Sequence, residues 1–262
     1  MPIPERLNPT FAAARPRVAD KAPEKIDDAR QRLIVALDVP NAAAATDLLD
    51  RLEGVCQWFK VGLEMFTAAG PACLAPLVAR GHSVFLDLKF HDIPNTVAGA
   101  VRSAAALGVR MMTVHAGGGP AMLQAARMAI EGLADPPLLL AVTVLTSMED
   151  TQLKATGLDR APAEQVTLLA KMGLEAGIRG FVCSPQEVAA LRTLTGPEGV
   201  LVVPGIRPAG AASGDQKRIA TPAEALRAGA SYLVVGRPIT QAPDPATAAE
   251  AILKEMAGAL LT

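Results

Sequence analysis

Residues 83–90 read Ser83-Val84-Phe85-Leu86-Asp87-Leu88-Lys89-Phe90, and this stretch decides how the chain folds. Side chains two positions apart share one face of a β-strand. One face is then wholly apolar, which suits packing against helices, whereas the other carries Phe85, Asp87 and Lys89. Because buried charges cost several kcal/mol unless they are paired, a strand that served stability alone would rarely place two of them inside. The pattern predicts a buried parallel strand with a chemical site at its end.

Seven other short apolar runs resemble this strand, at 33–39, 58–63, 111–116, 138–145, 180–184, 200–204 and 231–236. Helical spacing of apolar residues appears between them, at 41–52, 95–107, 120–133, 162–176 and 185–194 among others. Eight alternations of strand and helix predict the α/β class and a closed (βα)8 TIM barrel. The alternative is an open doubly wound sheet, which usually has a glycine-rich turn after its first strand. Here that position reads Leu37-Asp38-Val39-Pro40-Asn41.

The length of 262 residues and the 50% apolar content fit one barrel domain, which we place at residues 31–262. Residues 1–30 mix several prolines with charges and are expected to form an irregular N-terminal extension. The chain carries 25 basic and 26 acidic residues, so it lacks the positive field of a nucleic-acid-binding protein. These features predict a small-molecule partner and no nucleic acid.

No apolar run is long enough for a membrane helix, so we expect no membrane partner and a cytoplasmic location. The three cysteines, Cys56, Cys73 and Cys183, are widely spaced and odd in number, which predicts buried, reduced thiols. The histidines lack metal-ligand spacing, and no metal site is expected.

In a barrel, polar residues at the carboxyl ends of the strands carry the chemistry. The chain offers such charges at Asp38, Lys60, the Asp87/Lys89 pair, Arg207 and Arg237, and Asp92 follows three residues after Lys89. Alternating charges can hold an amine protonated and aimed at a reacting carbon, as a general acid requires. The competing interpretation is a structural ion pair. Just beyond, Asn95 or Thr96 is expected to cap the next helix.

Phosphate groups often bind to the loops after the seventh and eighth strands of a barrel. Arg207 follows Gly205 in the first of these loops, and Arg237 follows Gly236 in the second. Glycine permits close backbone approach and arginine suits bidentate phosphate contact. Residues 208–218 lack apolar periodicity, as a mobile lid would, and Gln216 could fold over the phosphate. Surface arginines and an ordinary loop are the plain alternatives.

The segment 85–97, Phe-Leu-Asp-Leu-Lys-Phe-His-Asp-Ile-Pro-Asn-Thr-Val, resembles the signature of the bacterial type of the orotidine 5'-phosphate decarboxylase family. The resemblance continues through 36–38, 60–62, 142–148, 204–208, 214–218 and 235–238, and so spans the chain from about residue 32 to its end. It implies decarboxylation of orotidine 5'-phosphate to uridine 5'-phosphate and CO2 in pyrimidine biosynthesis, without metal or organic cofactor.

The resemblance also implies a role for each matching residue. Lys89 would protonate C6 of the pyrimidine, with Asp87 beside the departing carboxylate and Lys60 completing the charge network and contacting the ribose. The chain would form a homodimer with shared active sites, in which Asp92 reaches into the partner's site. The other residues implied to bind substrate are Asp38 and Thr96 at the ribose, Gln216, Thr146 and Ser147 between phosphate and pyrimidine, and Arg207, Gly236 and Arg237 at the phosphate.

Two other functions stay open. Barrels with a similar Asp-x-Lys-x-x-Asp strand act on sugar phosphates with a magnesium ion, so a metal-dependent sugar-phosphate decarboxylase or aldolase is the enzyme alternative. A barrel that binds a nucleotide without turnover is the non-enzyme alternative. Sensitivity to a chelator would favour the first of these, and ligand binding without turnover would favour the second.

Overall fold

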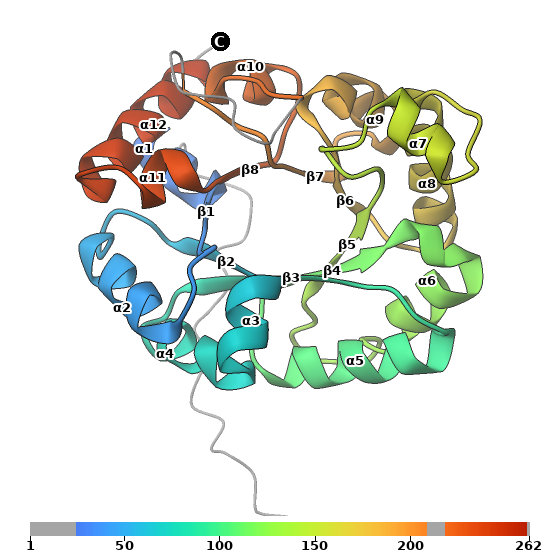
Figure 1. Ribbon diagram of the computed structural model, residues 1–262, viewed down its shortest axis with the longest axis horizontal. Helices are drawn as coiled ribbons and strands as arrows, with labels where there is room; N and C mark the ends of the chain where they lie inside the picture. Colours follow the sequence, from blue (N-terminus) through green and yellow to red (C-terminus); the bar gives the residue numbers. More distant parts are fainter. Residues whose placement is uncertain (1–24, 209–217, 261–262) are drawn as a thin grey trace, which may run out of the picture.

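A computed structural model describes residues 25–208 and 218–260 and contains a closed barrel of eight parallel strands, each paired with its sequence neighbours (Figure 1). The eighth strand closes the barrel by pairing with the first, Leu33 lying opposite Leu233. The strands are β1 (Leu33–Ala36), β2 (Trp58–Gly62), β3 (Ser83–Phe90), β4 (Met111–His115), β5 (Leu138–Val142), β6 (Gly180–Val182), β7 (Val200–Val203) and β8 (Tyr232–Val235).

Helices surround this ring of strands (Figure 1). In the described residues the α-helices are α1 (Lys25–Arg32), α2 (Ala42–Arg51), α3 (Leu63–Ala69), α4 (Ala75–Ala79), α5 (Pro94–Ala106), α6 (Gly119–Met128), α7 (Asp150–Ala155), α8 (Pro162–Glu175), α9 (Val188–Thr195), α10 (Pro222–Arg227), α11 (Arg237–Thr240) and α12 (Pro245–Ala259). Short 3-10 helices occur at η1 (Pro71–Leu74), η2 (Ala116–Gly118) and η3 (Pro185–Glu187).

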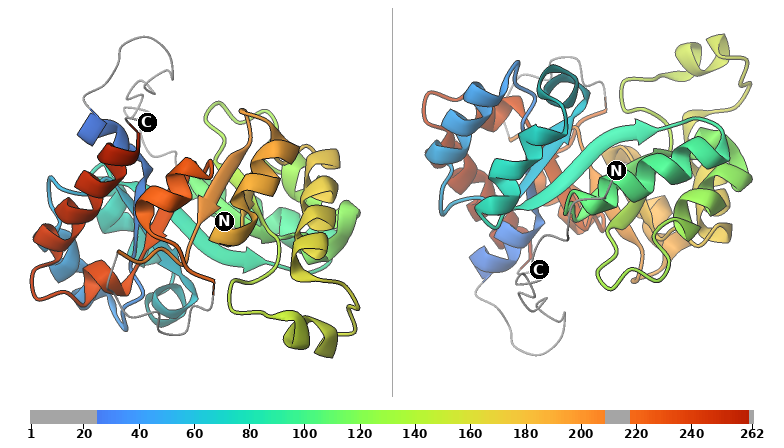
Figure 2. Two further views of the ribbon diagram at one scale, coloured as in Figure 1. Left: turned by 90° about the horizontal axis from the view of Figure 1, so that it is seen from above. Right: turned by 90° about the horizontal axis from the view of Figure 1, so that it is seen from below.

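The predicted (βα)8 barrel is therefore confirmed, and the open sheet is excluded by the pairing of β1 with β8. β3 has the bounds expected from its sequence and is 8 residues long. It is the long strand arrow in the right-hand view of Figure 2. The other strands begin within one residue of the expected positions but end one to three residues earlier, since their last apolar residues enter loops. The helix expected at 185–194 is divided into η3 and α9.

The chain is helical from Lys25, where α1 begins and continues to Arg32, packed beside α12. The last six residues of the expected irregular extension are thus helical, because Asp28 and Arg32 pair along one face of this helix at 3.1 Å. Residues 1–24 lie outside the described residues. The division into an extension and a barrel domain stays a prediction.

Apolar side chains form two layers, one inside the barrel and one between the strands and the helices. The layer inside the barrel includes Trp58, Phe85 and Met111, from three neighbouring strands. Two residues farther along the same strands stand Lys60, Asp87 and Thr113. The interior therefore changes from apolar to polar within one strand repeat, and the apolar side chains form a packed floor beneath the polar ones. The complete inner layer is Ile34, Ala36, Trp58, Phe85, Met111, Leu140, Val202 and Val234.

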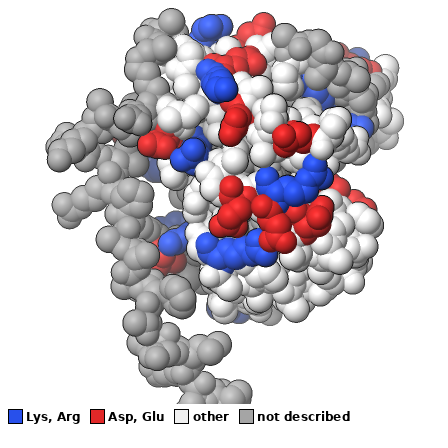
Figure 3. Space-filling model, turned by 90° about the vertical axis from the view of Figure 1, so that its left-hand side faces the viewer, with Lys and Arg blue, Asp and Glu red and all other residues white. Residues whose placement is uncertain are grey.

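The surface agrees with the balanced composition. On the flank of the barrel shown in Figure 3, acidic and basic side chains are interleaved rather than gathered by sign. Within residues 25–208 and 218–260, none of the helices has the length and apolar character needed to cross a membrane. The cysteines are buried and unpaired, as predicted, and burial raises the pKa of Cys56 to about 12.

Candidate active site

A cluster of four charges occupies the carboxyl ends of β1, β2 and β3. We call Asp38, Lys60, Asp87 and Lys89 the charged cluster. Lys60 Nζ lies 3.0 Å from Asp38 Oδ1 and 3.6 Å from Asp87 Oδ2. Lys89 Nζ donates to both carboxylate oxygens of Asp87 at 2.9 Å. Signs therefore alternate across the four side chains, and Asp87 lies between the two ammonium groups.

Burial differs within the charged cluster. The side chains of Lys60 and Asp87 are 11% and 13% exposed, while that of Lys89 is 32% exposed and that of Asp38 is 55% exposed. Burial raises the pKa of Asp87, but the charges of Lys60 and Lys89, with hydrogen bonds from Lys89 and Thr113, outweigh this and lower it below its ordinary value. Asp87 is thus a carboxylate at neutral pH, and it keeps an anion beside the Lys89 ammonium.

The backbone at Lys89 is unusual. Its φ is +50°, and among the described residues no other non-glycine residue has a positive φ. The pairing of β3 with β4 also shifts register between Leu86 and Phe90. A non-glycine residue in this region costs about 1–3 kcal/mol and persists only when its surroundings enforce it. Such bulges re-aim a side chain, and here the irregularity coincides with the predicted proton donor.

Two residues of this region were not identified from the sequence. Thr113, on β4, donates its hydroxyl proton to Asp87 Oδ1 at 3.0 Å and accepts from the Lys89 amide at 2.8 Å. A Cβ at Gly62 would lie 3.0 Å from Lys60 Nζ and 3.2 Å from Asp38 Oδ1, so a larger residue would press on this ion pair and require its side chains to shift. Strand alternation gave a signal for both, since Thr113 follows Met111 and Gly62 follows Lys60 by two residues.

Asp92 and Thr96 lie just beyond β3 and are exposed within the single chain. Asp92 Oδ1 accepts from the amide of Ile93 at 2.6 Å, and Asp92 has no ion pair with a described residue. The predicted capping of α5 by Asn95 or Thr96 is wrong, because the helix begins at Pro94 and its N-cap is Ile93, without a side-chain hydrogen bond. Proline supplies the first helical position without needing an amide partner.

Two histidines stack beside the charged cluster. The rings of His91 and His115 are 4.9 Å apart and inclined by 7°. The amide of Gly117 donates to His115 Nδ1 at 3.1 Å, so the neutral ring carries its proton on Nε2. Burial, followed by the charges of His91 and Lys89, lowers the pKa of His115. His91, an exposed residue of the loop after β3, therefore packs against His115.

The predicted phosphate residues Arg207 and Arg237, here called the arginine pair, follow β7 and β8. Arg207 is only 8% exposed, and its side chain donates to the carbonyl of Ile206 at 2.9 Å. Burial, and then the positive charge of Arg237, lower the pKa of Arg207 below its ordinary value. Gly205, before Arg207, has a φ of +78°, which glycine adopts without strain. Gln216 and most of the predicted lid lie outside the described residues.

The loop after β5, which carries Thr146 and Ser147, is fixed by a buried ion pair. Arg218 donates to the carbonyls of Leu145 at 2.9 Å and Thr146 at 3.5 Å, and it pairs with Glu187. The carboxylate of Glu187 also accepts from the amide of Ser184 at 2.9 Å. Arg218 belongs to a motif seen in the sequence, but its link between the loops after β5 and β6 was not anticipated. Arg218 thus connects the Thr146 loop to Glu187, the last residue of η3.

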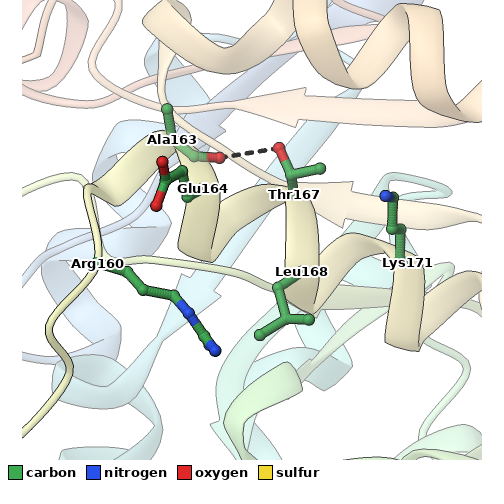
Figure 4. A pocket seen from close by; sticks show the side chains of 6 residues that line it. All are labelled: Arg160, Ala163, Glu164, Thr167, Leu168 and Lys171. Carbon is green, nitrogen blue, oxygen red and sulfur yellow. Dashed lines mark hydrogen bonds between the residues drawn. The ribbon is translucent and has the colours of Figure 1, made fainter.

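A separate hollow lies along the outer face of α8, lined by Arg160, Ala163, Glu164, Thr167, Leu168 and Lys171 (Figure 4). In it, Thr167 donates to the carbonyl of Ala163 at 2.8 Å, an ordinary contact within a helix. None of the predicted site residues lines this hollow. Over the described part of the chain, no group of three or more His, Cys, Asp or Glu side chains is arranged to hold a metal ion.

Comparison with known proteins supplies independent information. A family model described as orotidine 5'-phosphate decarboxylase / HUMPS family matches residues 31–252. A protein of Moorella thermoacetica named orotidine 5'-phosphate decarboxylase is 56% identical over 234 residues, covering 87% of this chain and 93% of that protein. A Vibrio campbellii protein of the same name is 54% identical over 228 residues, covering 87% of this chain and 98% of the relative.

A solved structure has the same fold. The crystal structure of orotidine 5'-phosphate decarboxylase from Lactobacillus acidophilus matches with a TM-score of 0.75 and 41% identity. The match covers 86% of this chain and 98% of that one. With the family match and the two relatives, this establishes that the chain belongs to the orotidine 5'-phosphate decarboxylase / HUMPS family.

Proposed function

We propose that this chain converts orotidine 5'-phosphate to uridine 5'-phosphate and CO2, with Lys89 as the proton donor to C6. The observation that carries this proposal is the charged cluster at the ends of β1–β3, in which Lys89 is held against an ionised Asp87. The names of relatives at 50–56% identity support the same reaction. The chain is accordingly a carboxy-lyase of pyrimidine biosynthesis.

The proposed chemistry begins when the bond between C6 and the carboxylate breaks and CO2 leaves. The electron pair stays on C6 in the plane of the ring, where the pyrimidine delocalises it poorly. The Lys89 ammonium then gives one proton to C6 and becomes a neutral amine, which solvent reprotonates. The attraction between the fixed ammonium and C6 increases as negative charge develops on C6. This attraction is the main stabilising effect.

Asp87 has two proposed roles. It keeps Lys89 protonated, because a neighbouring anion favours the ammonium form. It would also lie beside the substrate carboxylate, where like charges repel and loss of CO2 relieves the repulsion. Lys60, which contacts both Asp38 and Asp87, would complete the charge network and reach the ribose. Asp38, the most exposed member of the cluster, is free enough on its outer side to accept from a ribose hydroxyl.

The arginine pair is proposed to bind the 5'-phosphate. Burial, and then repulsion by the positive charge of Arg237, lower the pKa of the Arg207 guanidinium. A phosphate dianion would relieve this repulsion and accept bidentate hydrogen bonds. Gly236 would let the backbone approach the same group, and Gln216, Thr146 and Ser147 would span the phosphate and the pyrimidine.

We further propose that the enzyme is a homodimer whose sites are shared. Asp92 and Thr96 are exposed in the single chain, although the family resemblance gives both a place at the substrate. The neighbouring apolar side chains of Leu63 and Ile93 are 57% and 67% exposed at the ends of β2 and β3. A second copy would cover them and receive Asp92 and Thr96 at its ribose site. A cytoplasmic location is part of this proposal and fits the buried, unpaired thiols.

The reaction is proposed to need neither metal nor organic cofactor. The test adds purified, chelator-treated protein to orotidine 5'-phosphate and follows the loss of substrate absorbance, with uridine 5'-phosphate and CO2 identified as products. Full turnover after chelation is expected. Turnover of a keto-sugar phosphate restored by magnesium, without reaction of the nucleotide, would favour the metal-dependent sugar-phosphate enzyme instead. Tight binding of the nucleotide without products would favour a non-catalytic barrel.

A further inference from the structure

At the register shift, three residues of β3 lie opposite one residue of β4. Leu86 lies opposite Met112 and Phe90 lies opposite Val114. Residues 87, 88 and 89 therefore share a single facing residue, Thr113. β3 pairs with β2 without a register shift through Asp87, which lies opposite Gly62. The register shift is in the pairing of β3 with β4.

This arrangement removes the ordinary ladder partner of the Lys89 amide. In a bulge the extra residues are unpaired, and a buried amide without an acceptor is costly. The side chain of Thr113 supplies the acceptor, since its Oγ1 lies 2.8 Å from the Lys89 nitrogen. Lys89 is thereby held at its φ of +50°, the backbone conformation from which its side chain reaches Asp87.

The same hydroxyl orients the carboxylate. A hydroxyl has one proton, and in Thr113 it is donated to Asp87 Oδ1 at 3.0 Å. Thr113 is 0% exposed, and it stands on the packed floor formed by Phe85 and Met111. Because Thr113 is fully buried, bulk solvent does not reach its hydroxyl. One side chain therefore fixes both the backbone of the proton donor and the carboxylate that faces it.

We propose that Thr113 is a positioning residue, whose hydroxyl sets the location of the Lys89 ammonium relative to Asp87 and hence to C6 of the substrate. This inference rests on the proposed function only for its effect on turnover. Thr113 also helps keep Asp87 ionised, as its hydrogen bond is among the causes that lower the pKa of that carboxyl.

The test compares Thr113→Val, which removes the hydroxyl and keeps the branched shape, with Thr113→Ser, which keeps the hydroxyl. Because Lys89 acts on the transition state, Thr113→Val should lower kcat by about 10- to 100-fold and change KM by less than about threefold. Thr113→Ser should stay within about threefold of the parent in kcat. The control is Thr195→Val, a buried threonine near Gly199, before β7 at the opposite end of the barrel, and it should leave kcat unchanged.

Hydrogen exchange at the Lys89 amide gives a readout that does not depend on turnover. Exchange should be faster in Thr113→Val than in the parent and Thr113→Ser, because the acceptor is gone. If Thr113→Val fails to fold, Thr113→Cys and Thr113→Ser form a second pair of similar size, of which only Ser restores kcat. A Thr113→Val enzyme with kcat within threefold of the parent and unchanged exchange would overturn the inference. If the parent does not decarboxylate the nucleotide, the proposed function fails while the exchange comparison still tests Thr113.

Discussion

The charged cluster and the arginine pair lie at the same end of the barrel, yet their charges are handled in opposite ways. In the charged cluster every ammonium faces a carboxylate, and Asp87 is further bound by Thr113. In the arginine pair, burial and then the positive charge of Arg237 lower the pKa of Arg207. The first region is thus organised by carboxylates of the same chain, whereas the second is proposed to bind the phosphate of the substrate. This contrast suggests that contacts to the non-reacting phosphate provide binding energy, which lowers the barrier to reaction at the pyrimidine.

The largest effect is expected from mixing two inactive chains, which asks whether Asp92 of one subunit completes the site around the charged cluster of the other. Lys89→Ala and Asp92→Ala chains are unfolded together and refolded. Random pairing makes about half of the dimers mixed, and in each of these one site combines intact Lys89 with intact Asp92. About a quarter of all sites should recover activity, against nearly none for either variant refolded alone. Recovery of nothing, although mixed dimers are shown to form, means that Asp92 acts within its own chain.

Part of the candidate site could be predicted from the sequence. Strand alternation identified Asp87, Lys89 and Lys60 because charges at inward positions are conspicuous among apolar ones. Thr113 and Gly62 obey the same alternation but carry no charge, so their roles emerge only when the strands are placed side by side. For Lys89 the residue was identified but its backbone was not. Two-residue alternation could not predict its positive φ or the register shift. The cap of α5 was misplaced because Pro94 begins the helix one residue before the expected start.

A smaller effect is expected at the other region. Arg237→Ala should lower kcat/KM for orotidine 5'-phosphate by about 10- to 100-fold, the worth of a charge-assisted contact, while turnover of the phosphate-free nucleoside changes little. Kinetics on both substrates measure the difference. Arg227→Ala, an exposed arginine on α10, is the control and should affect neither substrate. Equal losses on both substrates would remove the phosphate role from Arg237.

The smallest effect concerns stability without ligand. The change in the free energy of unfolding should differ between a variant of the charged cluster and a variant of the arginine pair. Asp87→Asn leaves Lys89 without its carboxylate and Lys60 with Asp38 alone, and it should reduce the free energy of unfolding at pH 7 by about 1–3 kcal/mol. Arg237→Ala removes a cation whose charge lowers the pKa of Arg207, and it should reduce the free energy of unfolding by less than Asp87→Asn does. Denaturant unfolding of both variants and the parent measures this contrast. An Asp87→Asn protein as stable as the parent would show that the charged cluster is not organised as described.

The difference in unfolding free energy between the parent and Asp87→Asn should depend on pH, because the pKa of Asp87 is lowered in the folded protein. The unfolded carboxyl titrates near its ordinary value of 3.8, and the folded one titrates at lower pH. The contribution of Asp87 to stability is therefore complete above about pH 5 and is lost as the pH falls through the folded pKa. The difference in unfolding free energy between parent and Asp87→Asn should be constant from pH 7 to 5 and should narrow below pH 4. A difference that widens on acidification contradicts the lowered pKa.

The central claim is that Lys89 delivers the proton to C6, and the most direct test is Lys89→Ala measured against the parent in single-turnover decarboxylation. General acid catalysis by a positioned side chain accounts for about 100- to 10 000-fold in rate. The variant should lose at least about 100-fold in the rate of uridine 5'-phosphate formation, while it still unfolds in one cooperative thermal transition and binds that product within about tenfold of the parent. A variant that folds, binds product and still forms it within about tenfold of the parental rate would contradict the assignment of Lys89.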